Sequence, residues 1–387
     1  MTMKFPLNGK GEDEVLEELK IRTSEDLTFD SGRILGSMCT SPHPFARKVF
    51  ELYMDRNLGD PGLHKGSRKI ERDAVDMLAS LLSLERGYGH IVSGGTEANI
   101  LAVRAMRNMS DSERPELILP RSAHFSFLKA SDMLGVKLVW AELRNDYTVD
   151  VDDVEGKITD DTIGIVGIAG TTGLGVVDDI PALSDLAVDY GIPLHVDAAF
   201  GGFVIPFAKA LGYDLPDFDF RLRGVSSVTV DPHKMGMVPI PAGGIIFRDR
   251  KALDAISVPA PYLAGGGISQ ATVTGTRPGA SALATWAMIK HLGFSGYTKV
   301  VDRVMRLSRW FASRIKHIVG LELVRDPVLN IVSFTSTTKR IEFLGEELRK
   351  RGWGVSAHRG YVRIVVMPHV KRENLEEFLE DLSRLLK

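Results

Sequence analysis

The sequence lacks the features that mark several large classes of protein. It holds a single cysteine, Cys39, among 387 residues, which excludes an intrachain disulfide, a cysteine-based zinc site and an iron–sulfur cluster. We predict no metal site of another kind. No apolar run approaches the roughly 20 residues that span a bilayer, and residues 12–14 are acidic where a signal peptide needs its apolar segment. We therefore expect a cytoplasmic, soluble protein.

The sequence also lacks an excess of charge of one sign. Its 48 lysines and arginines nearly balance its 50 aspartates and glutamates, which leaves a net charge of −2. Such a chain has no overall positive field to hold a nucleic-acid backbone or an anionic membrane. Apolar residues at 44% and charged residues at 25% are typical of an ordinary globular protein. We expect an enzyme that acts on a small molecule.

Short apolar runs alternate with amphipathic segments between about residue 88 and residue 247. Strands that alternate with helices predict an α/β fold with a mostly parallel sheet that is covered on both faces. The runs that read as strands begin near residue 90 and continue at 116–120, 137–141, 163–169, 193–197, 225–231 and 244–247.

The pattern changes after residues 277–279, where a long helical stretch begins that is broken near 293–296. Strand-like runs at 321–325, 331–335 and 361–366 follow, with helices at 340–351 and 372–386. We predict an N-terminal segment of a helix and loops (1–60), a large domain (61–280) and a small C-terminal α+β domain (281–387).

Segments that follow predicted strands carry the chemistry, because ligands bind at strand ends in open α/β sheets. Residues 93–99 (SGGTEAN) place two glycines at a helix start, where free N–H groups and the helix dipole attract a phosphate. A tight turn capped by Thr96 is the alternative.

Residues 195–202 (HVDAAFGG) put Asp197 and Ala199 on one strand face, where a carboxylate beside a small side chain suits a flat aromatic ring. An aspartate that merely caps a turn is the alternative there.

A third segment, residues 229–236 (TVDPHKMG), holds a lysine directly after a buried strand. A lysine shifted toward its neutral form is a nucleophilic amine, as a Schiff base requires; taken alone, Lys234 would be a surface lysine. The order of a phosphate site, a D-x-A strand end and an H-K pair matches the layout of a pyridoxal 5′-phosphate (PLP) site. We therefore predict a PLP-dependent enzyme.

These three segments resemble those of fold-type I PLP enzymes, specifically the group II amino-acid decarboxylases. Residues 30–38 (DSGRILGSM), 57–62 (NLGDPG) and 274–279 (TGTRPG) extend the resemblance over the whole chain, toward the archaeal L-tyrosine/L-aspartate decarboxylases. The resemblance implies a mostly parallel seven-stranded sheet in the large domain. It also implies a homodimer with active sites at the interface.

The resemblance assigns roles around the cofactor. It makes Lys234 the residue that carries PLP as a covalent aldimine, Asp197 the partner of the protonated ring nitrogen, and His124 the ring that stacks on the cofactor. Without it, His124 would be a helix cap or a buried histidine. The other predicted cofactor contacts are Gly95, Thr96, Thr171 at the ring oxygen, Ala199, His233 near the phosphate, and Thr276 reaching the phosphate of the partner subunit.

Three further residues are expected at the substrate. Arg363 resembles the arginine that clamps a substrate carboxylate with two parallel hydrogen bonds; a solvent-facing arginine is the alternative. His43 resembles part of a loop that lines the substrate pocket. Tyr262, in a glycine-rich loop, resembles the acid that protonates Cα, and an exposed loop tyrosine is the alternative.

The expected reaction is decarboxylation of an L-amino acid. We favour L-aspartate, giving β-alanine for coenzyme A, over L-tyrosine, giving tyramine for methanofuran, and over L-glutamate. Another fold-type I PLP lyase or an aminotransferase is the nearest alternative activity, and a scaffold without activity is a more distant one.

Overall fold

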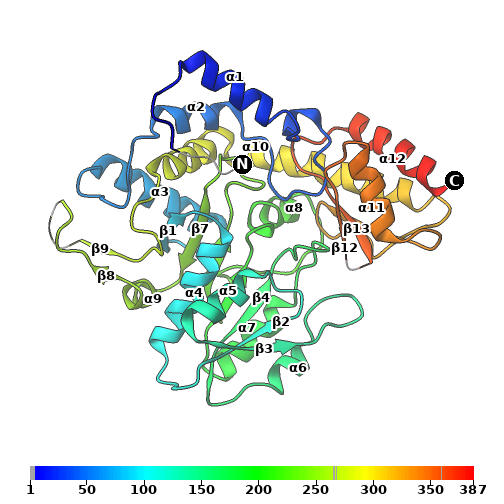
Figure 1. The fold of residues 1–387 in the computed structure, drawn as a ribbon. Helices are drawn as coiled ribbons and strands as arrows, with labels where there is room; N and C mark the ends of the chain where they lie inside the picture. The colour runs from blue at the N-terminus through cyan, green and yellow to red at the C-terminus, as the bar shows by residue number, and fades with distance from the viewer. Residues whose placement is uncertain (1–4, 265, 267, 359) are drawn as a thin grey trace.

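A seven-stranded sheet lies at the centre of the large domain in the computed structural model, which describes residues 5–264, 266, 268–358 and 360–387 (Figure 1). The strand order is β1-β7-β6-β5-β4-β2-β3, and neighbours are parallel except where β7 pairs with β1 and β6. This confirms the predicted mostly parallel sheet. The strands are β1 (Tyr88–Val92), β2 (Glu116–Pro120), β3 (Lys137–Ala141), β4 (Thr162–Ile168), β5 (Leu194–Asp197), β6 (Val225–Val230) and β7 (Gly243–Phe247).

Helices that precede, connect and follow the strands pack around this sheet. Helix α3 contacts β1 and β7, α4 contacts β5, β6 and β7, and α7 contacts β4 and β5. Every residue of β4 is buried, as expected for a parallel strand covered on both faces. The helices are α3 (Lys65–Leu81), α4 (Gly95–Met109), α5 (Ser126–Leu134), α6 (Val151–Glu155), α7 (Ile180–Asp189), α8 (Ile205–Ala210) and α9 (Arg250–Ala255), with a 3₁₀ turn η2 (Gly201–Phe203).

The C-terminal region forms a second, antiparallel sheet in the order β10-β11-β13-β12 (orange and red in Figure 1). Its strands are β10 (Leu321–Leu323), β11 (Ile331–Ser336), β12 (Ser356–His358) and β13 (Tyr361–Val365), and its helices are α11 (Ile341–Lys350) and α12 (Arg372–Leu386). Strand β12 has no counterpart in the sequence analysis, because three residues at a sheet edge show no alternating pattern.

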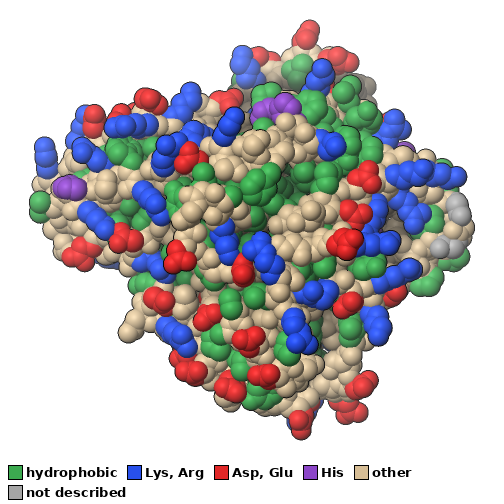
Figure 2. Space-filling view, turned by 180° about the vertical axis from the view of Figure 1, so that it is seen from behind, with side chains coloured by type: hydrophobic (Ala, Val, Ile, Leu, Met, Phe, Trp, Pro, Cys, Tyr) green, Lys and Arg blue, Asp and Glu red, His purple; other side chains and the backbone are tan. Residues whose placement is uncertain are grey.

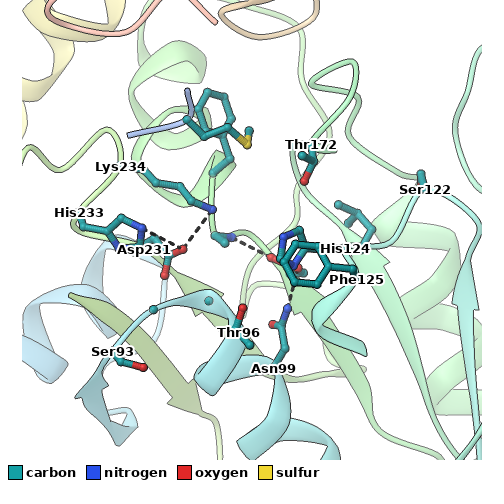
Figure 3. A pocket seen from close by; sticks show the side chains of 18 residues that line it. Ser93, Thr96, Asn99, Ser122, His124, Phe125, Thr172, Asp231, His233 and Lys234 are labelled. Carbon is teal, nitrogen blue, oxygen red and sulfur yellow. Dashed lines mark hydrogen bonds and ion pairs between the residues drawn. The ribbon is translucent and has the colours of Figure 1, made fainter. Parts of the chain in front are cut away.

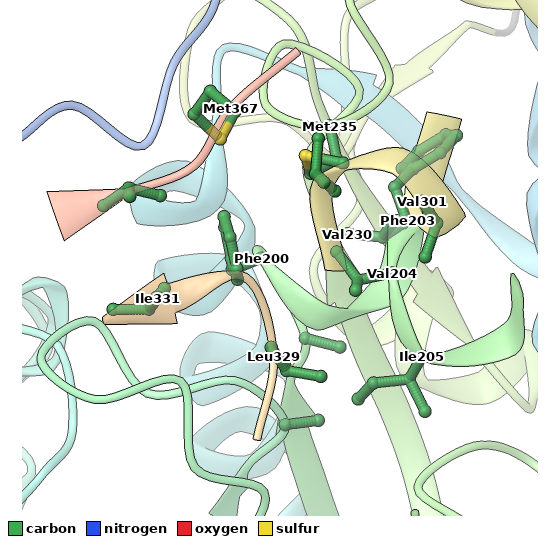
Figure 4. Packing of buried hydrophobic residues seen from close by; sticks show 14 of the residues in the cluster. Phe200, Phe203, Val204, Ile205, Val230, Met235, Val301, Leu329, Ile331 and Met367 are labelled. Atoms are coloured by element: carbon green, nitrogen blue, oxygen red, sulfur yellow. The ribbon is translucent and has the colours of Figure 1, made fainter. Parts of the chain in front are cut away.

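Helix α10 (Gly279–Ile315) connects the two sheets and is broken at Gly293, where φ is 57° and ψ is −175°. Only glycine adopts such a backbone at little cost, which explains why the predicted break lies there. Between the sheets, Phe200 and Phe203 pack in one apolar cluster with Val230, Leu329 and Ile331 (Figure 4). This cluster packs next to the end of β5, which carries Asp197, and the turn after β6, which carries Lys234.

The N-terminal segment contains two helices, α1 (Glu12–Arg22) and α2 (Pro44–Leu52), and a 3₁₀ turn η1 (Phe29–Ser31), so the expectation of one helix was wrong. Helix α2 packs on α10, whereas α1 buries no residue. The stretch between them reaches the C-terminal sheet, where Leu35 O accepts a hydrogen bond from Val365 N at 2.7 Å.

Lysines, arginines and acidic residues are interspersed over the face shown in Figure 2, as the balanced composition predicts. Among the described residues, no helix has the length and apolar character needed to cross a membrane. Nor do histidine, cysteine and acidic side chains of this part of the chain gather into a metal-binding group.

Candidate cofactor and substrate site

A cavity of about 360 Å³ opens at the ends of β4, β5 and β6, within the ~300–1,000 Å³ range of small-molecule sites (Figure 3). All three segments singled out in the sequence line it. Lys234 and His233 approach from one side, and His124 and Phe125 stand on the other (Figure 3). The topology therefore brings together residues that are more than 100 positions apart in the chain.

The glycine pair before α4 forms one wall of this cavity. The helix begins at Gly95, so Thr96 is its second residue and makes no capping hydrogen bond, contrary to the suggestion that it caps the helix. The first N–H groups of a helix have no partner within it. A Cβ on Gly95 would lie 2.9 Å from Asp231 Oδ2 and 3.1 Å from Ala199 Cβ, so glycine is what lets this helix end approach the loops after β5 and β6. The result is a helix start that borders the cavity, a position suited to an anionic ligand.

Lys234 enters the cavity from the turn that follows β6. Its Nζ lies 3.1 Å from Oδ2 of Asp231, and the two side chains are 17% and 1% exposed, so Lys234 is not a surface lysine. The other oxygen of Asp231, Oδ1, is buried without a hydrogen-bond partner among the described residues. Asp231 thus keeps the amine pointed into the cavity and retains one free acceptor.

His233, beside the lysine, donates a hydrogen bond from Nδ1 to Ala242 O at 2.6 Å. Burial disfavours its charged form, but the Asp231 carboxylate 4.0 Å from Nε2 and the Cys39 side chain outweigh burial, so the pKa of His233 is raised. The raised pKa favours the charged form of this imidazole, and that form attracts an anionic ligand next to the start of α4.

Asp197 is the last residue of β5 and is 7% exposed. Its Oδ1 accepts a hydrogen bond from Ala199 N at 3.0 Å, and its Oδ2 accepts one from Asn99 Nδ2 at 2.8 Å. Strand β5 ends at Asp197, so the strand alternation expected from the sequence does not extend to Ala199. Ala199 lies in the turn that follows, and it nevertheless lines the cavity.

His124 stands two residues before α5 and lines the cavity wall opposite the lysine. Its Nδ1 accepts a hydrogen bond from Ser126 N at 3.2 Å. Burial lowers the pKa of His124 even though the Asp197 carboxylate opposes that shift. The ring is therefore a neutral, planar group at neutral pH.

Five predicted site residues lie outside this cavity of their own chain: Thr171, Thr276, Tyr262, Arg363 and His43. Thr171 is buried, and its hydroxyl accepts a hydrogen bond from Val176 N at 3.0 Å, while the neighbouring Thr172 lines the cavity. Thr276 is exposed on the glycine-rich turn. Tyr262 is 85% exposed on the hairpin formed by β8 (Val258–Pro259) and β9 (Ser269–Gln270), which projects from the body of the chain in Figure 1.

Arg363, on β13, lines an adjoining cavity that shares His124 and Thr172 with the first one. Its guanidinium donates to Thr172 O at 2.7 Å and to Gly36 O at 2.6 Å, and its Nε is buried without a partner in the described structure. It is therefore held in place and does not face bulk solvent.

His43 does not line either cavity. It caps α2, where its Nδ1 accepts a hydrogen bond from Phe45 N at 3.2 Å, and its ring lies 5.3 Å from that of His291. Its backbone N donates to Met237 O at 2.9 Å, which ties this loop to the segment that carries the lysine.

Sequence reasoning did not single out Asn99, Asp231, Ser122 and Thr172, all of which line the cavity. The position of Asn99 could have been predicted, because it lies one helical turn after Gly95 and therefore on the same face of the helix. Asp231 is the first polar residue after β6 in the segment that contains the lysine. Ser122 and Thr172 lie in irregular loops, where spacing predicts no direction.

The residues present fit PLP. The cavity offers a helix start and a histidine with a raised pKa for a phosphate, a carboxylate for a ring nitrogen, and a primary amine for an aldehyde. Two buried polar atoms, Asp231 Oδ1 and Ser122 Oγ, have no partner among the described residues, and such atoms indicate that a ligand completes the site.

Residues 67–337 match the family model of the pyridoxal-dependent decarboxylase conserved domain. The chain belongs to this family. It is 76% identical over 383 residues to L-aspartate decarboxylase of Thermococcus kodakarensis, covering 99% of both chains. It is 70% identical over 384 residues to L-aspartate/L-glutamate decarboxylase of Pyrococcus horikoshii, covering 99% of this chain and 100% of the relative.

Among solved structures, the chain is similar to sphingosine-1-phosphate lyase of Burkholderia pseudomallei, with a TM-score of 0.91 and 30% identity, covering 99% of this chain and 92% of the other. The prediction of a group II PLP-dependent decarboxylase with the fold-type I architecture is confirmed.

Proposed function

We propose that the protein removes the 1-carboxylate of L-aspartate, giving β-alanine and CO₂, with PLP bound covalently to Lys234. The observation that carries this proposal is the convergence of Lys234, Asp197 and His124 on one cavity, with Arg363 on the wall of the adjoining one. Support for the substrate comes from the Thermococcus relative, which is named for aspartate.

Bound PLP supplies an electron sink for the pair of electrons that remains when the Cα–carboxylate bond breaks. Lys234 provides the amine that holds the cofactor. The Asp197 carboxylate holds a proton at the ring nitrogen, which keeps the sink electron-poor. His124 and Ala199, which line the cavity, would contact the ring, and the start of α4 would bind the phosphate.

Aspartate carries two carboxylates, of which one leaves as CO₂ and the other has to be bound. Arg363 is suited to this task because its buried Nε is unpaired in the described structure and its remaining donors reach only backbone carbonyls. Arg363 is half-buried and has no carboxylate partner in the described structure, and an acidic substrate would supply one. A proton then replaces CO₂ at Cα, which balances the reaction.

We further propose that two subunits share each site. Helix α1 buries no residue, and its Leu16, Leu19 and Ile21 are 62%, 52% and 64% exposed, as expected of a surface that a second copy covers. Thr276 and Tyr262 are exposed and lie outside their own cavity. In a homodimer Thr276 would bind the phosphate of the partner subunit, and the Tyr262 hydroxyl would deliver the proton to Cα there.

A substrate panel tests the proposed activity. Purified protein loaded with PLP is assayed for CO₂ release and amine formation with L-aspartate, L-glutamate and L-tyrosine, without a keto acid. We expect the highest kcat/KM with aspartate. Glutamate is the second candidate because the Pyrococcus relative is named for both acids, and one extra methylene changes discrimination by only about 10- to 200-fold. A preference for tyrosine, or a requirement for a keto acid, would contradict the proposal.

Replacing Arg363 tests its role in binding the acidic substrate. Arg363→Met should raise KM for aspartate so that kcat/KM falls about 10- to 100-fold, since hydrogen bonds to charged groups are lost. Arg340→Met, on a side chain 86% exposed in the same domain, is the matched control. Equal kcat/KM in the Arg363 variant and the control would remove Arg363 from the site.

Tyr262→Phe tests the proton donor while keeping the ring. Bond cleavage precedes protonation, so CO₂ release should continue while part of the product becomes aldehyde. The variant should lose activity during turnover and regain it with fresh PLP. If it forms only amine and shows merely a higher KM, Tyr262 is a lid residue and not the proton donor.

A further inference from the structure

A chain of buried polar side chains lies behind Asp197. Asn99 donates from Nδ2 to Asp197 Oδ2 at 2.8 Å, the dashed line at its amide in Figure 3. On the far side of Asn99, its Oδ1 lies 3.1 Å from Nε2 of His195, whose Nδ1 is 2.8 Å from Ser227 Oγ. These side chains are 2% exposed or less.

The sheet register explains why these residues meet. His195 and Asp197 are two apart on β5 and so share one face, and their partners on β6 are Ser227 and Thr229. Helix α4 packs against β5 and β6 on that face and brings Asn99 over them. Two strands and one helix therefore contribute to a single network.

The charge of Asp197 fixes every donor and acceptor in this network. An ionised carboxylate only accepts, so the NH₂ of Asn99 must face Asp197, and its second N–H reaches Ser126 Oγ at 2.9 Å. Asn99 Oδ1 then accepts from the Thr229 hydroxyl at 2.8 Å and from Nε2–H of His195.

His195 consequently carries its proton on Nε2, and its Nδ1 accepts from the Ser227 hydroxyl at 2.8 Å. Complete burial lowers the pKa of His195 to about 4, so the ring is neutral at neutral pH. The hydrogen bond to Asn99 Oδ1 then sets which nitrogen carries the proton. All four hydrogen-bonding positions of the Asn99 amide are used.

Folding alone gives no reason for this arrangement. Apolar side chains of the same shape would fill the space with little change in stability, whereas each unsatisfied member of a polar network carries a penalty. The network ends at Asp197, the carboxylate of β5 that lines the cavity, so we look for its role in the state of that carboxylate.

We propose that Asn99 is a positioning residue that keeps Asp197 ionised and oriented toward the cofactor ring nitrogen, and that His195 fixes the Asn99 amide in the orientation this requires. The inference rests on the assignment of Asp197 to the ring nitrogen in the proposed function. It adds two residues, Asn99 and His195, that act on the cofactor ring through Asp197.

The physical effect concerns the proton shared by the ring nitrogen and Asp197. Donors to a carboxylate stabilise its anionic form, which leaves the proton on nitrogen. Without Asn99, Asp197 keeps only the Ala199 N–H as a donor among the described residues, and its anionic form loses stabilisation. The proton then moves toward the carboxylate, and the ring nitrogen becomes less positive.

The test uses the substrate-free holoenzyme loaded with PLP that carries ¹⁵N in the ring. Its nitrogen chemical shift reports protonation without turnover. We expect the wild-type shift to be that of a protonated ring, the Asn99→Leu shift to lie well toward the deprotonated value, and the dissociation constant for PLP to rise about 10-fold or more. Asn108→Leu, the same change at an exposed position of α4, should match the wild type.

A pair of His195 variants keeps the test decisive if Asn99→Leu fails to fold. His195→Gln retains an N–H donor for Asn99 and should keep the wild-type nitrogen shift, whereas His195→Leu should move it toward the deprotonated value. Identical shifts in the two His195 variants, or a wild-type shift in folded Asn99→Leu, would overturn the inference.

Asp197→Asn separates this inference from the proposed function. If the wild-type ring nitrogen is protonated and Asp197→Asn abolishes this, the assignment of Asp197 stands and the Asn99 and His195 variants decide the inference alone. If Asp197→Asn leaves the shift unchanged, the assignment itself fails, and the inference fails with it.

Discussion

The two ends of the site differ in how much of their structure one chain provides. At the cofactor end, Lys234, Asp197 and His124 are largely buried, and each has a defined partner within the chain. Tyr262 and Thr276, by contrast, lie on exposed segments away from their own cavity. The packed sheet fixes the positions of the cofactor residues, because they lie at or just after strand ends. The positions of Tyr262 and Thr276 depend instead on whether a second subunit covers the exposed segments. The cofactor end should therefore be sensitive to single substitutions, and the other end to subunit association.

The largest effect should come from Lys234→Ala, which removes the amine that holds the cofactor. We expect turnover below detection and loss of the visible absorption band of the bound cofactor. Borohydride reduction followed by peptide mapping should label Lys234 in the wild type and no residue in the variant. Lys251→Ala, at an exposed lysine of α9, should keep both signals; labelling of another lysine would remove Lys234 from its role.

Asp197→Asn should leave the fold intact and reduce kcat by at least about 100-fold, because preorganised charge at the reacting system is lost. The asparagine amide also presents N–H groups to Asn99 Nδ2 or Ala199 N, both of which are donors. Circular dichroism and thermal melting of the apo-protein check the fold. A kcat near that of the wild type would show that Asp197 does not face the ring.

Subunit mixing tests the exposed end of the site. Lys234→Ala and Thr276→Asp should each be inactive alone, the latter because its carboxylate repels a phosphate. If Thr276 serves the neighbouring site, each mixed dimer carries one intact site, and random exchange should restore about a quarter of the wild-type activity. Mixtures that stay inactive, although mass spectrometry detects mixed dimers, would place Thr276 in its own chain's site or in none.

The smallest effect concerns acid stability of the buried network. Burial lowers the pKa of His195 to about 4, below the unfolded value near 6.5, so the unfolded chain binds more protons between these values. The stability contribution is present above about pH 6.5 and is lost as the pH falls toward 4. At pH 4.5 the loss amounts to about 2 to 3 kcal/mol.

His195→Gln removes this titration and serves as the reference. The variant should gain stability relative to the wild type between pH 7 and pH 4.5, measured by urea unfolding at each pH. The comparison uses the difference between the two proteins because Asp178, whose pKa burial raises to about 7, contributes the opposite slope over part of this range. A constant difference across the range would show that His195 does not titrate as inferred.

Much of the fold follows from local pattern. Strands β2 and β3 begin and end at the predicted residues, and α12 does as well, because apolar runs and helical periodicity are read along the chain. The glycines near residues 293–296 predicted the break in α10, which the structure has at Gly293. One of the two N-terminal helices escaped prediction even though the nine residues of α2 are amphipathic. Strand β12 escaped prediction because three residues carry little periodic signal.

Residue chemistry and order made the three cofactor segments recognisable from the sequence, and the family match confirms the class of enzyme. The sequence did not reveal Asn99 or Asp231 as parts of the cavity, and it favoured Thr171 where Thr172 lines the wall. In a loop, spacing does not tell which side chain faces inward, because no repeating geometry relates neighbours.

The sequence by itself determined which chemical groups are available and where strands end, since both are local properties. Only the tertiary structure decided that Asn99 from α4, His195 from β5 and Ser227 from β6 form one network behind Asp197. The reason is physical: strand order and helix packing are set by burial of the whole sheet, and contacts between distant segments exist only once that burial is complete.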